Sequence, residues 1–161
     1  MSSEFLTGVE YPHPFDELVV ALCESASRQL CVLSPTLDHA VFDQAALISA
    51  VGALVRRSRQ TEVRILISDS RAIVTRGHGL LQLARRLPST VLVRKLEEHP
   101  DWNGETVVVR DHNGVLFKPG GADHEGFYEP DSRASTRRHL ELFNDLWRHS
   151  VEDVNLRQLS V

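Results

Sequence analysis

The sequence lacks the features that mark membrane, secreted or disulfide-bonded proteins. No apolar run in its 161 residues approaches the roughly 20 residues that a membrane-spanning helix needs. The first residues, MSSEFLTGVEYPHPF, contain neither a basic n-region nor an apolar h-region, so we expect no signal peptide and a cytoplasmic protein. Cys23 and Cys31 are the only cysteines. They have no partners at zinc-ligand spacing, and a reducing compartment disfavours a disulfide, so we expect buried free thiols.

The chain also lacks the basic excess and the aromatic content typical of nucleic-acid-binding proteins. Its net charge is -4, its pI is about 6.0, and aromatic residues make up 6%. Nucleic acid and anionic membranes are therefore not attracted globally, and few rings are available to stack on bases. We expect neither partner, and we interpret the clustered arginines as solvated helix faces: Arg56, Arg57, Arg59, Arg133, Arg137, Arg138 and Arg148.

The length of the chain and the absence of repeats, low-complexity tracts and linkers indicate a single domain. The first ten residues look loosely ordered, and Pro12 and Pro14 precede the first stretch of helical spacing. We therefore assign residues 1–12 to an N-terminal extension. The domain itself is predicted to cover residues 13–155, and residues 156–161 are predicted to form a C-terminal tail.

Predicted helices and strands alternate along most of this domain. Apolar residues at helical spacing predict helices at about 15–29, 41–59, 75–87 (with Thr75 or a neighbour as the cap) and 132–151. Buried strands are predicted at LCVLS (30–34), VRILIS (63–68) and TVLVRKL (90–96), and a hairpin turning at Asn113-Gly114 within GETVVVRDHNGVLF (104–117). The alternation predicts an α/β fold, with a mixed β-sheet (a parallel core plus an antiparallel hairpin) and helices on both faces.

This order of elements resembles one half of the phospholipase D-like fold. HLELFNDLWRHS (139–150) looks like the C-terminal helix of that fold, and VVVRDHNGVLF (107–117) looks like its motif strand and turn. Members of the superfamily carry H-x-K, four further residues and Asp on this strand. With Asp111 as the aspartate, Gly104 and Thr106 stand at the histidine and lysine positions.

The resemblance implies a scaffold without the family's phosphodiester chemistry. Glycine offers no nucleophile, and threonine supplies no fixed positive charge for a phosphoryl group. A second copy of the chain would repeat the same defect. The chain resembles, more specifically, uncharacterised phospholipase D-like domains of pseudomonads. Some of these are associated with acetyltransferases of the GNAT type, which the resemblance implies as a possible partner.

One segment has the features of a ligand site at the end of a parallel strand. SDSRAIVTRGHG (68–79) leaves a predicted strand and enters a helix, and open α/β sheets bind ligands outside the carboxyl ends of their strands. The segment could bind a small anion beside free backbone N–H groups, or it could be a connecting loop with solvated arginines. The candidate ligand-binding residues are Ser34, Thr36, Asp69, Arg71, Arg76 and His78.

Histidines beside aspartates raise the question of a metal site. Asp111-His112 and Asp123-His124 repeat one dipeptide, and His99 lies nearby in sequence. Imidazole and carboxylate suit zinc, but Asp and His beside Asn-Gly are also ordinary turn residues. We favour the turn, because no i, i+4 pair or HExxH-like spacing supports a metal. No metal and no other cofactor are therefore expected.

Two hypotheses for function remain. The first is a non-catalytic binding module whose partner is another protein or a second copy, with Trp102 as a candidate interface aromatic. The second is a hydrolase that uses Asp69 with His78, or His112. An enzyme requires one of these histidines within hydrogen-bond reach of a carboxylate inside a closed pocket.

Overall fold

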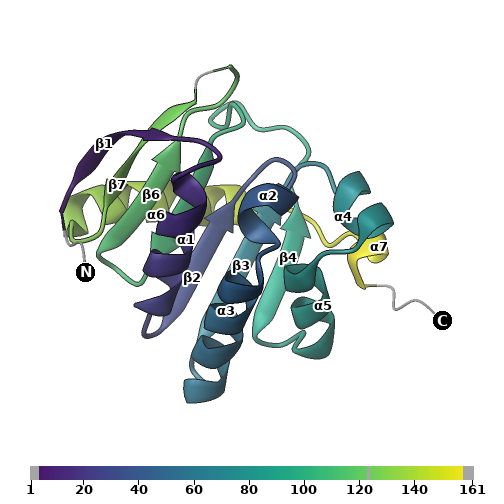
Figure 1. Cartoon of the computed structure of the whole chain (residues 1–161). Helices are drawn as coiled ribbons and strands as arrows, with labels where there is room; N and C mark the ends of the chain where they lie inside the picture. Colours follow the sequence, from purple (N-terminus) through teal and green to yellow (C-terminus); the bar gives the residue numbers. More distant parts are fainter. Residues whose placement is uncertain (1–3, 123, 158–161) are drawn as a thin grey trace.

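The computed structural model describes residues 4–122 and 124–157 as one mixed sheet with helices packed on it (Figure 1). The strands are β1 Leu6–Glu10, β2 Gln29–Leu33, β3 Glu62–Ile67, β4 Val91–Lys95, β5 Thr106–Arg110, β6 Gly114–Lys118 and β7 Glu125–Glu129, in the order β1-β7-β6-β5-β2-β3-β4. β2 is parallel to β3, and β3 to β4, whereas β2 is antiparallel to β5. The predicted parallel core and antiparallel hairpin are confirmed.

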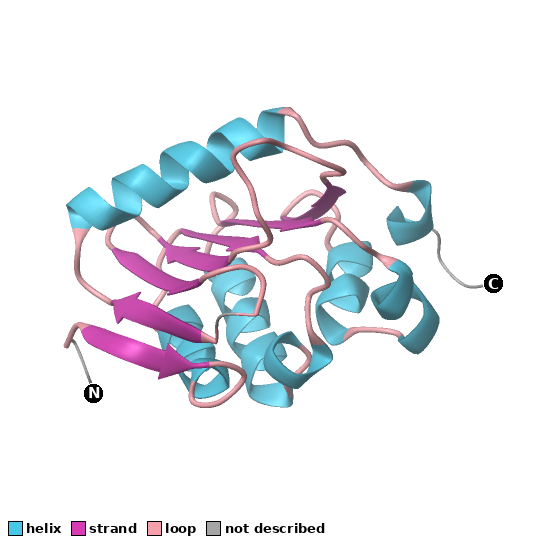
Figure 2. Ribbon diagram, turned by 90° about the horizontal axis from the view of Figure 1, so that it is seen from above, coloured by secondary structure: helices cyan, strands magenta, loops and turns pink. Residues whose placement is uncertain are grey.

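Helices cover both faces of the sheet, as predicted (Figure 2). Among the described residues, one face carries a single helix, α6 Arg133–Arg148. The other face carries α1 Phe15–Glu24, α2 His39–Phe42, α3 Ala45–Arg57 and α5 Gly79–Arg86. The short helices α4 Arg71–Arg76 and α7 Val154–Arg157 lie towards the β4 side. None of the helices in the described ranges is long and apolar enough to cross a membrane.

The central strand β2 is buried on both faces, which explains its unbroken apolar sequence. Leu30 and Val32 point into the larger core beneath α1 and α3, and Cys31 and Leu33 point into the smaller core beneath α6. A strand that is covered on both sides has no need for polar residues at alternate positions. The sequence LCVLS therefore predicts a central strand correctly.

Both cysteines are buried and free, as predicted. Burial raises the pKa of the Cys23 thiol to about 12. Burial also raises the pKa of Cys31 to about 11, although the nearby Arg64 guanidinium acts in the opposite direction. Both thiols are therefore protonated, and chemically unreactive, near neutral pH.

Three predicted helices have different limits in the structure. α1 ends at Glu24, because Gln29 already begins β2. The helix predicted over 41–59 is interrupted between α2 and α3. Thr75 is not a cap, since it lies inside α4, and the residue that caps α5 is His78, whose ring accepts a hydrogen bond from the backbone N–H of Leu80.

Both ends of the domain also differ from the prediction. Residues 6–10 are not loosely ordered, because β1 pairs with β7 at one edge of the sheet, and β7 itself was not predicted. Val151 lies outside α6 and forms a bridge with Lys95. Leu156 was assigned to the C-terminal tail, but it is buried in the larger core. Residues 158–161 of that tail lie outside the described residues.

The hairpin between β5 and β6 turns differently from the Asn-Gly turn that the sequence predicts. Gly114 pairs with Arg110 as the first residue of β6, and the residue with positive φ is Asp111, at 51°. The Asp111 carboxylate accepts hydrogen bonds from the backbone N–H groups of residues 27, 28 and 29, at 2.8 to 3.3 Å. Asp111 therefore joins the hairpin turn to the loop that leads into β2.

Replacing Asp111 with glycine should lower the free energy of unfolding by about 2 to 3 kcal/mol, because three backbone N–H groups lose a charged acceptor. Glycine tolerates the positive φ, so the substitution adds no backbone strain to the loss of the carboxylate. Urea unfolding measures the difference, with the exposed neighbour variant His112→Ala as the control, expected within about 0.5 kcal/mol of wild type. Equal stability of the two variants would contradict this role.

Candidate functional site

The loops that follow β2 and β3 meet at one edge of the sheet, here called the carboxyl edge. The backbone N–H groups of Ser68 and Asp69 donate to the carbonyl of Pro35, at 3.0 and 2.9 Å. β5 begins at the same edge, because Val107 pairs with Leu33 at the end of β2. The segments that the sequence selects as ligand-binding loops are therefore neighbours in space.

Two of the predicted binding residues hold the backbone of this edge instead of facing a ligand. Leu37 has a positive φ of 52°, and its N–H donates to Ser34 Oγ at 3.1 Å. The carbonyl of Leu37 accepts from His78 Nε2 at 3.0 Å, and His78 Nδ1 accepts from the N–H of Leu80 at 3.1 Å. Ser34 and His78 are each 1% exposed. Both ring nitrogens of His78 are thus occupied.

The side chains of the other four predicted binding residues do not gather around Ser34 and His78. Arg71 makes a two-pronged ion pair with Asp69, with Nη2 2.7 Å from Oδ2, and is 89% exposed. Hydrogen bonds from Arg71 lower the pKa of Asp69 to about 2. Thr36 and Arg76 are exposed. The six residues share one edge, but their side chains do not converge on one point.

The remaining sequence candidates also have structural explanations. Asp111 is a turn residue, as favoured, and His112 is exposed at the hairpin tip without a hydrogen bond or ion pair to its ring in the part of the chain that is described. Trp102 is not a free aromatic, because it is 9% exposed and its Nε1–H donates to the carbonyl of Glu105. Asp123, from the second Asp-His pair, lies outside the described residues.

A cavity of about 700 Å³ opens at the carboxyl edge, beside the start of β5. Its lining is formed by Ser68, Glu97, Glu98, His99, Pro100, Trp102 and Gly104. Most of these residues belong to the loop between β4 and β5, from which the sequence singles out His99, Trp102 and Gly104 without predicting a cavity. Two adjacent exposed glutamates just after β4 were the available signal, since strand ends are where α/β sheets bind ligands.

The cavity coincides with the position where the phospholipase D motif would lie. Gly104, at the histidine position, lines the cavity and has a φ of 84°. Thr106, at the lysine position, is buried in β5 directly opposite Lys118 of β6. The Lys118 ammonium donates to the carbonyl of Pro119 and lies over the ring of Tyr11, at 5.3 Å.

The lining of this cavity is acidic. Glu97 and Glu98 are exposed, and Asp101 follows closely. The ammonium of Lys95 is 4.0 Å from Glu97 Oε1 and offsets one of these charges in part. Among the described residues, no lysine or arginine lines the cavity. Such a lining favours a positively charged ligand over a phosphate.

Comparison with known proteins identifies the fold. Residues 11–159 match the model of a domain of unknown function, DUF7931. No curated protein matches the chain. Nuc from Salmonella typhimurium, a phospholipase D family member, has a TM-score of 0.67 and 15% identity, over 93% of this chain and 97% of that one. NucT from Helicobacter pylori has a TM-score of 0.60 and 12% identity, over 93% and 100%.

TrmBL2, an archaeal chromatin protein that binds DNA, is a further structural neighbour. It has a TM-score of 0.66 and 12% identity, and the match covers 93% of this chain but only 54% of TrmBL2. At such identities the likeness concerns the fold alone. The fold is phospholipase D-like, as the resemblance of the sequence implies.

Acid should destabilise the protein through His78. Burial lowers the pKa of His78 in the folded chain to about 4, against 6.5 when it is exposed. The unfolded chain therefore binds more protons between these values, so this contribution to stability is complete above pH 6.5 and is lost as the pH falls through about 4. Between pH 7 and pH 5 the loss should be about 2 kcal/mol.

Urea unfolding of His78→Gln measures this contribution, because the variant should lose less stability than wild type between those two pH values. His112→Gln, which changes an exposed histidine, should keep the wild-type dependence on pH. Parallel pH profiles for wild type and His78→Gln would rule out a neutral buried His78.

Proposed function

We propose that this chain, which belongs to the family of the domain of unknown function DUF7931, is a non-catalytic binding module on a phospholipase D-like scaffold. The observation that carries the proposal is the pair of residues at the two motif positions, Gly104 just before β5 and Thr106 at its start. Gly104 has no side chain to attack a phosphodiester, and Thr106 is buried in the strand. A phosphoryl-transfer site requires a nucleophile and fixed positive charge, and neither position supplies them.

The histidines near the carboxyl edge give little support to the alternative of a hydrolase. His78 is buried with both ring nitrogens hydrogen-bonded, so it has no free lone pair for a substrate proton. His99 lines the cavity, but its Nδ1 accepts from the N–H of Asp101. The glutamates beside it would also repel a phosphodiester.

A positively charged segment of a protein partner is the ligand class that fits the cavity best. Glu97 and Glu98 supply negative charge at its rim, and the exposed Pro100 supplies apolar surface for the stem of a lysine or arginine side chain. This lining favours a basic peptide over the small anion that the sequence suggests. A GNAT-type acetyltransferase domain, which the resemblance implies as an associate, is one candidate for the protein that carries such a segment.

The purified chain should not hydrolyse a chromogenic phosphodiester such as bis(4-nitrophenyl) phosphate above the rate in buffer. The physical reason is the absence of a nucleophile at position 104 and of a phosphate-binding cation at position 106. Release of nitrophenolate measures the rate. Turnover that disappears in His99→Ala, while His112→Ala retains it, would establish an enzyme and overturn the proposal.

A short oligolysine peptide should bind the chain, and Glu97→Gln combined with Glu98→Gln should weaken binding at least fivefold, because two charges at the rim of the cavity are lost. Isothermal titration calorimetry at low salt measures the affinity. The matched control combines Glu24→Gln with Glu141→Gln, two exposed glutamates on helices. Equal weakening by both double variants would show that only net charge matters.

A further inference from the structure

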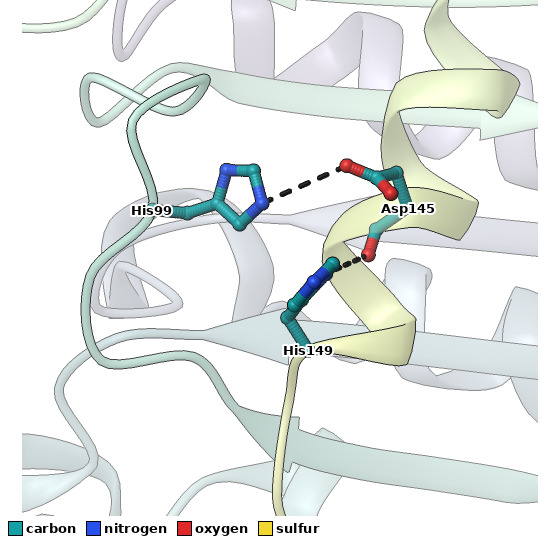
Figure 3. A group of neighbouring side chains, drawn as sticks. All are labelled: His99, Asp145 and His149. Carbon is teal, nitrogen blue, oxygen red and sulfur yellow. Dashed lines mark hydrogen bonds and ion pairs between the residues drawn. The ribbon is translucent and has the colours of Figure 1, made fainter.

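Three side chains from two distant parts of the chain meet beside the cavity (Figure 3). His99 belongs to the loop after β4, Asp145 lies in the last turn of α6, and His149 is the residue that ends this helix. One potential ligand atom of each side chain lies within 4.8 Å of those of the other two. The rings of His99 and His149 are 5.0 Å apart, edge to face.

The hydrogen bonds of His149 leave one ring nitrogen free for a ligand. Its Nδ1 lies 2.9 Å from the backbone carbonyl of Asp145, which can only accept, so Nδ1 carries the proton. Nε2 of the neutral ring then carries a lone pair. Metal-binding histidines in proteins commonly have their second nitrogen held by a carbonyl or carboxylate in this way.

Asp145 supplies the carboxylate of the group. Its Oδ1 accepts a hydrogen bond from Arg148 at 3.0 Å, and its Oδ2 lies 3.6 Å from Nε2 of His99. The distance of 3.6 Å is too long for a strong hydrogen bond. Oδ2 and Nε2 therefore face each other without a firm contact.

We propose that His99 Nε2, Asp145 Oδ2 and His149 Nε2 bind one divalent transition-metal ion of the zinc class. Two imidazoles and one carboxylate suit Zn²⁺, whereas Mg²⁺ and Ca²⁺ prefer oxygen ligands throughout. Ligand atoms on a tetrahedral Zn²⁺ lie roughly 3.4 Å apart, so separations of up to 4.8 Å must shrink by as much as about 1.4 Å. His149 is exposed at the end of its helix and has room for this adjustment.

Binding requires His99 to move its proton from Nε2 to Nδ1. In the structure Nδ1 accepts from the N–H of Asp101 at 3.1 Å, so the proton of the neutral ring is on Nε2. Nδ1–H then gives up the hydrogen bond from the Asp101 N–H and donates instead to Asp101 Oδ2, which lies 3.9 Å away and is reached by a small rotation. The Asp101 carboxylate would then hydrogen-bond one nitrogen of the His99 ring while the other nitrogen binds the metal. Such a hydrogen bond orients the ring and makes it a stronger ligand.

The ion would fix the β4–β5 loop to the end of α6. His99 also lines the cavity at the carboxyl edge, so the bound metal would hold one wall of that cavity in place. Three protein ligands leave one position of a tetrahedral ion for water or for a group from a partner.

Titration of the full chain, without a histidine tag, with Co²⁺ tests the proposal. One equivalent should bind and give visible d–d absorption bands, and Zn²⁺ should displace it. His149→Ala should weaken binding at least tenfold, because one of three ligands is lost. His112→Ala removes an exposed histidine elsewhere and should bind as wild type does. His149 is exposed, so its variant is expected to fold, which circular dichroism can verify.

Arg148→Ala gives a second and opposite readout. The Arg148 guanidinium partly neutralises the Asp145 carboxylate through Oδ1, so removing the guanidinium should tighten Co²⁺ binding. Adventitious binding of Co²⁺ to surface histidines would not respond to this substitution. The proposal fails if the wild type shows no saturable binding, if His149→Ala binds as tightly as wild type, or if Mg²⁺ displaces Co²⁺ at equal concentration.

Discussion

The whole arrangement depends on the different directions in which β2 pairs on its two sides. It runs parallel to β3 and antiparallel to β5, so the end of β3 and the start of β5 meet at one edge. Its register is fixed because Leu30 and Val32 fill one core while Cys31 and Leu33 fill the other. A slip by one residue would exchange these sets and disrupt both cores. The cavity beside Gly104 is a product of that pairing.

One end of the β2–β5 pair is held by a stabilising turn, and the other end lies at the cavity. At one end the Asp111 carboxylate gathers the backbone N–H groups that lead into β2. At the other end the acidic loop after β4 surrounds the cavity. Since these ends are separated by the length of the strands, the loop can change in sequence without loosening the turn. Such a division suits a fold that carries different functions on one scaffold.

Patterns that are local in sequence were sufficient to predict the parallel core and α6. β7 was missed because Gly126 resembles a loop residue, although glycine is needed there for a different reason: a Cβ would clash with the backbone carbonyl of Phe117. The group of His99, Asp145 and His149 has no common spacing, since its members come together only when α6 packs on the sheet. Likewise, the use of His78 as a cap depends on the position of Leu37.

The conformation of Gly104 also bears on whether the phospholipase D motif could be introduced into this chain. With a φ of 84°, this position would strain any histidine by roughly 1 to 2 kcal/mol. A lysine at 106 would stand directly across the strands from Lys118 and would place two like charges in a nearly closed interior. Histidine at position 104 and lysine at position 106 would therefore give the motif residues without the geometry of the motif. A phosphodiesterase-type site at this position would therefore also require a different backbone conformation at residue 104, just ahead of β5.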